Sequence, residues 1–163
     1  MKKILVIGSP GVGKSTFSRR LQKKINLPII YLDQLFWRSD KTTVSKEEFL
    51  SQVKLKMQAD AWIMDGNYSD SLFNERLNAC NTVFFLDYSV DTCLSGVRQR
   101  WGKKRPDMTW IEEQEDKEFM NYIRLFPKIQ KPNIVRILKD HPNITVYSFK
   151  NRQESLDFLD KLG

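Results

Sequence analysis

Short apolar runs alternate along the chain with longer stretches in which apolar residues recur every three or four positions. The short runs predict five strands, at Lys3–Ile7, Pro28–Leu32, Trp62–Met64, Thr82–Leu86 and Ile144–Phe149. The longer stretches predict helices at Lys14–Ile25, Lys46–Asp60, Asp91–Trp101, Ile111–Phe126, Asn133–Lys139 and Gln153–Leu162. Strands that alternate with helices form βαβ units, whose parallel strands are covered by helices on both faces of the sheet. The pattern therefore predicts an α/β fold, a three-layer sandwich around a parallel sheet of five strands.

Composition indicates one globular domain spanning residues 1–163. Apolar residues make up 40% of the chain and charged residues 29%, with only 7 Gly and 6 Pro, which excludes disordered and collagen-like classes. No apolar run approaches the roughly 20 residues of a membrane span. The two cysteines, Cys80 and Cys93, cannot form a disulfide framework. We therefore expect a cytoplasmic protein that is monomeric and has no membrane partner.

The charge balance points to anionic partners without choosing among them. Lys and Arg number 27 against 20 Asp and Glu, which gives a net charge of +7. Such a surplus favours nucleotides, phosphorylated metabolites or nucleic acid. It is also an ordinary property of a soluble surface, so charge alone decides nothing.

A phosphate-binding motif follows the first predicted strand and matches G-x-x-x-x-G-K-[ST]. It comprises Gly8, Ser9, Pro10, Gly11, Val12, Gly13, Lys14, Ser15 and Thr16. Its glycines let successive backbone N–H groups point into one concavity that holds phosphate oxygens. Lys14 reaches the β- and γ-phosphates, and the Ser15 hydroxyl ligates Mg²⁺. Because the motif lies between a strand and a helix, it predicts a nucleotide site and not merely a glycine-rich turn.

With four further segments, the chain resembles the adenylate-kinase-like group of P-loop small-molecule kinases. Within that group it is similar to the DNA topology modulation protein family. The segments are Tyr31–Trp37, Trp62–Ser69, Phe85–Asp87 and Arg105–Met108. The resemblance covers nearly the whole chain and implies the strand order 2-3-1-4-5, ATP with Mg²⁺, and phosphoryl transfer to a small-molecule acceptor. The family's name refers to DNA supercoiling, yet no tyrosine here has the setting of a topoisomerase nucleophile.

Three aspartates follow predicted strands, at the sheet edge where open α/β folds bind ligands. The resemblance implies that Asp33 orients or deprotonates the attacking hydroxyl, or faces the metal shell; the alternative is a helix N-cap. In the kinase order, strand three lies beside strand one, so Asp65 would emerge next to the phosphate loop and hold Mg²⁺ through water. Asp87 ends the fourth strand on the other side of the loop and is its rival for that role.

Two departures from the nucleoside-monophosphate kinases leave the acceptor open. Those kinases often read Asp-Gly-Phe-Pro-Arg where this chain has Asp65–Ser69, so the arginine that grips the acceptor phosphate is missing. Gly96 stands at about the position of an arginine that contacts the ATP base in those kinases. Arg100, by contrast, fits their phosphate-binding arginine. The acceptor can therefore be a nucleoside, a nucleotide, a sugar or another alcohol.

A basic segment precedes an acidic one between the fourth and fifth strands. The cations are Arg98, Arg100, Lys103, Lys104 and Arg105. In the resembled kinases this place holds the lid that closes over ATP, and here the lid would be short, at about residues 101–110. A solvated charged hairpin is one alternative. A nucleic-acid patch, in which Trp101 and Trp110 stack on bases, is the other.

Two later arginines complete the set of candidate site residues. Arg124 is expected to face the cleft as a further catalytic cation. Arg152 follows the last strand, in a loop that touches the adenine base in the resembled kinases; a turn in which Ser148 or Asn151 caps the last helix is an equal alternative. The sequence thus predicts an ATP- and Mg²⁺-dependent kinase. The rival functions are a DNA-binding regulator switched by ATP, and a metabolite kinase of the shikimate or gluconate type.

Overall fold

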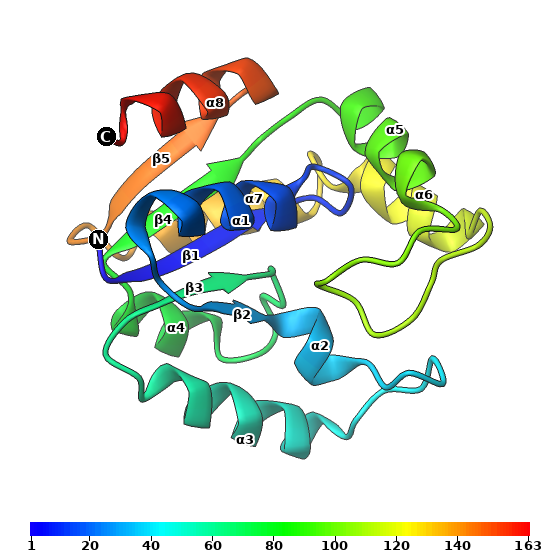
Figure 1. Cartoon of the computed structure of the whole chain (residues 1–163), viewed down its shortest axis with the longest axis horizontal. Helices are drawn as coiled ribbons and strands as arrows, with labels where there is room; N and C mark the ends of the chain where they lie inside the picture. Colours follow the sequence, from blue (N-terminus) through cyan, green and yellow to red (C-terminus); the bar gives the residue numbers. More distant parts are fainter.

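The computed structural model describes residues 1–163 and places a parallel sheet at the centre of the molecule (Figure 1). Its strands are β1 (Lys3–Gly8), β2 (Ile29–Tyr31), β3 (Trp62–Asp65), β4 (Thr82–Leu86) and β5 (Thr145–Phe149). They lie in the order β2-β3-β1-β4-β5, and every neighbouring pair is parallel. This confirms the predicted fold class and strand order.

Helices cover both faces of the sheet. They are α1 (Lys14–Ile25), α2 (Leu32–Phe36), α3 (Lys46–Met57), α4 (Phe73–Ala79), α5 (Val90–Arg100), α6 (Lys117–Leu125), α7 (Gln130–Lys139) and α8 (Arg152–Lys161). Alternate side chains of β1 enter two cores, as the two-residue period of a strand requires. Ile4 and Val6 join buried residues of α1, α5, α6 and α8. Leu5 and Ile7 join those of α3, α4 and α7 on the opposite face.

The structure adds two helices to the predicted elements and shortens a third. The short helices α2 and α4, of five and seven residues, were not predicted because so few turns give no clear periodicity. The helix expected from Ile111 begins only at Lys117. Asp116 caps it, accepting hydrogen bonds from the backbone N–H groups of Glu118 and Phe119. A cap of this kind fixes where a helix starts, and it leaves residues 111–116 free to take part in the site.

Smaller shifts occur at other helix ends. The helix expected over Lys46–Asp60 ends at Met57, and α7 begins three residues before the expected Asn133. Pro132 lies in the first turn of α7, where its missing N–H has no intrahelical acceptor in any case. None of the helices has the length and apolar character needed to cross a membrane.

Candidate active site

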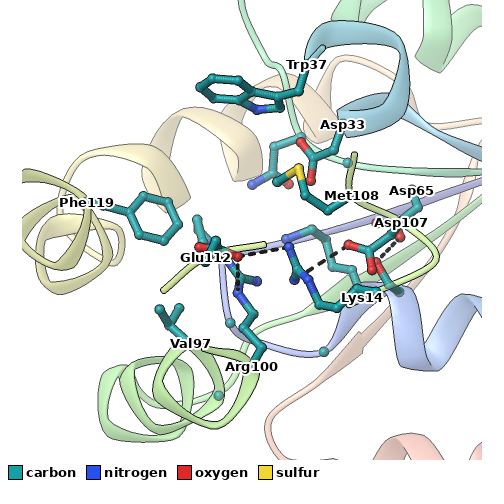
Figure 2. Close-up of a pocket in the computed structure, with 18 of the residues that line it drawn as sticks. Lys14, Asp33, Trp37, Asp65, Val97, Arg100, Asp107, Met108, Glu112 and Phe119 are labelled. Carbon is teal, nitrogen blue, oxygen red and sulfur yellow. Dashed lines mark hydrogen bonds and ion pairs between the residues drawn. The ribbon is translucent and has the colours of Figure 1, made fainter. Parts of the chain in front are cut away.

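A cleft of about 1500 Å³ opens at the carboxyl end of the sheet. Its walls come from the phosphate loop, from α2, from the loop after β3 and from the segment between α5 and α6. Open α/β sheets bind their ligands at this edge. Figure 2 shows the side chains that meet there, with Lys14 at the start of α1, Asp33 on α2 and Asp65 at the end of β3.

The phosphate loop connects the end of β1 to the first residue of α1. Gly11 and Gly13 have φ angles of 79° and 98°, in the left-handed region that favours glycine, and this turns the backbone toward the cleft. The Nζ atom of Lys14 donates hydrogen bonds to the carbonyl oxygens of Gly8 at 2.9 Å and Ser9 at 3.1 Å. Burial lowers the pKa of Lys14, while the charges of Asp65 and Asp33 act in the opposite direction. The loop thus presents backbone donors and one cation to an anionic ligand.

Ser15 and Asp65 form the part of the site suited to a metal ion. The Ser15 hydroxyl donates to Oδ2 of Asp65 at 2.5 Å. Burial raises the pKa of Asp65 to about 7, against the effects of Lys14 and the Ser15 hydrogen bond. No group of three or more His, Cys, Asp or Glu side chains could hold a metal here. Mg²⁺ typically takes only one or two protein oxygens and fills its shell with phosphate oxygens and water, so this pair fits it.

Asp87, the rival aspartate, is engaged elsewhere. Its Oδ2 atom forms ion pairs with Lys131 at 2.7 Å and Lys150 at 2.5 Å. Asp87 does not line the cleft, whereas Asp65 does. The parallel pairing of β3 with β1 is what brings Asp65 beside the phosphate loop, since it aligns Asp65 with Val6.

Replacing these two aspartates by asparagine should therefore have unequal effects. We expect Asp65→Asn to weaken Mg²⁺-dependent ATP binding by about tenfold or more, the cost of losing a charged partner. Asp87→Asn is the matched control and should leave this binding near the wild-type value. Calorimetry with and without Mg²⁺ measures both. An equal loss, or a larger one at Asp87, would contradict the placement of the metal at Asp65.

Asp33 faces the cleft from the first turn of α2. The N-cap of this helix is Tyr31, so the alternative role of Asp33 as a helix N-cap is wrong. Its Oδ1 atom accepts a hydrogen bond of 2.5 Å from the hydroxyl of Tyr68. Burial raises the pKa of Asp33, although the Tyr68 hydrogen bond and the charge of Lys14 oppose this shift. A carboxylate whose pKa is raised toward neutrality is suited to accept a proton.

A chain of ion pairs lines the cleft near Lys14 (Figure 2). Arg100 at the end of α5 contacts Oε1 of Glu112 at 2.9 Å, and Arg105 contacts the same oxygen at 2.9 Å. Arg105 also lies 3.6 Å from Oδ2 of Asp107, whose side chain is only 7% exposed. Burial, followed by the charge of Arg105, lowers the pKa of Arg100. Glu112 therefore occupies a position between two arginines that would equally suit a phosphate group.

The expected lid segment, residues 101–110, rests against α2. Gln34 donates a hydrogen bond to the carbonyl oxygen of Pro106, and Thr109 donates to that of Trp37 at 3.1 Å. The rings of Trp37 and Trp110 meet edge to face with their centroids 5.5 Å apart. The segment thus spans the cleft from α5 to α2. Within it Lys103 and Lys104 are exposed, whereas Arg105 faces inward, as does Arg100 at the end of α5.

The remaining sequence-predicted residues divide into two groups. Pro10, Gly11, Gly13, Thr16 and Arg152 line the cleft with Lys14 and Ser15. Gly8, Ser9 and Val12 do not, and the side chain of Val12 lies in the core. Arg124 is exposed on α6 and is not brought to the cleft. Asn151 caps α8 by accepting a hydrogen bond from the backbone N–H of Glu154 at 2.9 Å. Of the two caps considered for the last helix, Asn151 is therefore confirmed and Ser148 is not.

Gly96 has a role that the sequence did not reveal. It lies on α5, where a side chain would collide with the carbonyl oxygen of Gly11. A side chain at Gly11 would likewise meet the backbone of Cys93 on the same helix. The phosphate loop therefore packs backbone to backbone against α5. This close approach explains why no arginine stands at position 96.

Sequence similarity to known proteins extends over about half of the chain. No protein-family model matches the chain. The adenylate kinase of Mycobacterium leprae (strain Br4923) is 30% identical over 87 residues, which make up 52% of this chain and 46% of that protein. The adenylate kinase of strain TN gives the same figures. The matching region thus spans about half the length of these curated relatives.

Solved structures share the architecture over nearly the whole chain. A shikimate kinase from Acinetobacter baumannii in complex with shikimate has a TM-score of 0.69 and 16% identity, covering 99% of this chain and 90% of that one. A gluconokinase from Sinorhizobium meliloti 1021 has a TM-score of 0.55 and 14% identity, covering 99% and 93%. At these identities the likeness establishes the fold alone. The chain has the fold of the P-loop kinases.

Proposed function

We propose that the protein transfers a phosphoryl group from ATP, with Mg²⁺, to a hydroxyl of a small-molecule acceptor. The observation that carries this proposal is the hydrogen-bonded pair of Ser15 and Asp65 beside Lys14, with the carboxylate of Asp33 facing the same cleft. The names of the similar proteins support it, since adenylate kinase, shikimate kinase and gluconokinase all denote transfer to small molecules.

Each residue of the cleft has a distinct role in the proposed reaction. Lys14 and the backbone N–H groups of the phosphate loop hold the β- and γ-phosphates. Ser15, as a direct ligand, and Asp65, through water, would hold Mg²⁺, which would offset the negative charge of the phosphates. Asp33 orients the acceptor hydroxyl and takes its proton as the new oxygen–phosphorus bond forms and the bond to ADP breaks. Arg100 stabilises charge on the transferred group once phosphate takes the place of Glu112.

For the acceptor we propose a nucleoside-like or nucleotide-like compound. The side of the cleft near Asp33 carries the aromatic residues Trp37, Tyr68 and Trp110, whose rings suit a planar base. Sugar acids and polyols, the acceptors suggested by a shikimate- or gluconate-type kinase, form the second candidate class. We further propose a monomer that works in the cytoplasm, where its free buried cysteines Cys80 and Cys93 stay reduced.

A panel of acceptors scored by ADP release tests this proposal. Nucleosides, nucleoside monophosphates, shikimate, gluconate and simple polyols are each supplied with ATP and Mg²⁺. We expect acceptor-dependent ADP release with a nucleoside or nucleotide. If only a sugar acid stimulated ADP release, the acceptor would belong to the sugar acids and not to the nucleosides. If no compound raised ADP release above the rate of ATP hydrolysis without an acceptor, the kinase proposal would be contradicted.

Substitutions in the basic segment distinguish a kinase from a DNA-binding regulator related to the DNA topology modulation proteins. A lid acts through the inward cation Arg100, whereas a DNA surface would spread its affinity over all the cations through counterion release. We expect Arg100→Ala to lower turnover by roughly a hundredfold, as for loss of a transition-state donor. Lys103→Ala and Lys104→Ala should change turnover by less than about twofold, because surface charges contribute little.

The same variants are tested for DNA affinity at two salt concentrations. We expect weak binding that nearly disappears at physiological salt. If substitutions at all the cations weakened DNA binding alike while turnover stayed constant, the segment would be a nucleic-acid surface and not a lid.

A further inference from the structure

Arg76 on α4 is a cation buried without an acidic partner. It is 0% exposed and forms no ion pair. Its guanidinium donates hydrogen bonds to three successive carbonyl oxygens, those of Gly66 at 3.4 Å, Tyr68 at 2.7 Å and, between them, Asn67. It also stacks on Phe73 at 5.2 Å from the ring centroid. All of its hydrogen-bond acceptors belong to the loop that follows β3.

This arrangement is costly if packing is its only purpose. Burial lowers the pKa of Arg76 to about 10, which reflects the unfavourable removal of the charge from water. Buried charges without a carboxylate are rare, and an apolar side chain of similar size usually serves a core as well or better. The loop that the guanidinium holds is itself unusual, because Tyr68 has a φ of 42°, in the left-handed region that non-glycine residues seldom occupy. Such a conformation persists only where the surroundings enforce it.

The loop held by Arg76 touches both halves of the candidate site. On one side, the Asn67 side chain forms two hydrogen bonds with the backbone of Gly8, the first residue of the phosphate loop. Its Oδ1 atom accepts from the Gly8 N–H at 2.9 Å, and its Nδ2 atom donates to the Gly8 carbonyl oxygen at 2.5 Å. That same carbonyl accepts from Lys14. On the other side, Tyr68 donates its hydroxyl proton to Asp33.

We propose that Arg76 is a positioning residue that sets the phosphate loop and the acceptor-side carboxylate relative to each other. It acts through Asn67 on Gly8 and Lys14, and through Tyr68 on Asp33, and it touches neither substrate. The inference rests on the proposed kinase function and extends it. In-line transfer requires donor and acceptor groups to be held within a fraction of an ångström, and one buried residue with bonds to both arms meets that need.

The test uses Arg76→Met and Arg76→Lys, with Asn67→Ala and Tyr68→Phe to break each arm alone. Met keeps the apolar length of the side chain and removes its donors, whereas Lys keeps the charge without the guanidinium fork. Arg136→Met is the matched control, because Arg136 is exposed on α7 and bonds only to Asn133. ATP dissociation constants from calorimetry, kcat and acceptor KM are measured for each folded variant, alongside thermal unfolding.

We expect Arg76→Met to weaken ATP binding about tenfold and to lower kcat by roughly a hundredfold, the scale of a small misplacement of reacting groups. Arg76→Lys should recover part of both. Asn67→Ala should reproduce mainly the loss of ATP affinity, and Tyr68→Phe mainly the loss of kcat. The double variant Arg76→Met with Asn67→Ala should bind ATP no more weakly than Arg76→Met alone, because both substitutions break the same connection between Arg76 and the phosphate loop. Arg136→Met should match the wild type.

Three results would overturn the inference. The first is a folded Arg76→Met variant with wild-type ATP affinity and kcat. The second is full additivity in the double variant. The third is wild-type behaviour of both Asn67→Ala and Tyr68→Phe, which retain Arg76 and so decide the question even if Arg76→Met does not fold. ATP affinity is measured directly, so a protein that binds ATP without phosphorylating any acceptor would contradict the proposed function separately.

Discussion

Lys14→Ala should lower phosphoryl transfer by roughly a hundredfold or more, the effect of removing one preorganised donor to the transition state. The Nζ atom of Lys14 reaches back over the phosphate loop to the carbonyl oxygens of Gly8 and Ser9. The aliphatic part of the side chain contributes to neither hydrophobic core. The fold should therefore survive the substitution with a nearly unchanged unfolding temperature.

The measurement is steady-state turnover of the folded variant with saturating ATP. Lys24→Ala is the matched control, since Lys24 is an exposed lysine in the last turn of the same helix. We expect that control to retain wild-type turnover. Full activity in the Lys14 variant would be incompatible with phosphate activation by this loop.

Asp33→Asn should lower kcat by about 10²- to 10⁴-fold, the usual contribution of a general base. Asparagine keeps an oxygen that can accept the hydrogen bond from Tyr68, so the local geometry is preserved while the proton acceptor is lost. The exposed Asp60, replaced by asparagine, serves as the control.

The pH dependence of wild-type turnover provides a second test of Asp33 as the proton acceptor. Burial raises the pKa of this carboxyl, so on acidification it becomes protonated at a higher pH than an ordinary aspartate does. Only the ionised form accepts a proton. Turnover should therefore fall as the pH decreases through the raised pKa. Asp33→Asn should lose the part of this acidic limb that Asp33 contributes, whereas the part due to protonation of Asp65, whose pKa burial raises to about 7, should remain. An identical limb in both proteins would assign the proton transfer to another group.

The alternation of strand and helix patterns was sufficient to predict the sheet and its covering helices. The phosphate loop was predictable because its function depends on consecutive residues whose backbone conformation is encoded locally. The placement of Asp65 beside that loop followed from the strand order, which the resemblance implied and the structure confirms.

The residues that sequence reasoning missed make contacts that depend on how loops fold back, and no motif in the sequence marks such contacts. Glu112 was included in a predicted helix, and nothing in its neighbourhood along the chain shows that it pairs with Arg100 and Arg105. Arg76 contacts backbone carbonyl groups 8 to 10 residues away. Every residue type has such a carbonyl, so the sequence does not show which ones Arg76 contacts. The expectation for Arg124 depended on the phase of a helix that begins six residues later than its pattern suggested.

The backbone contact between Gly11 and Gly96 also restricts how this protein can diverge. Any side chain at position 96 would have to push the phosphate loop away from α5. An arginine that reads the base, as in the nucleoside-monophosphate kinases, is therefore not accessible by a single substitution from this sequence. Selection for a particular base would have to act elsewhere in the cleft, where the exposed Arg152 is one of the lining residues.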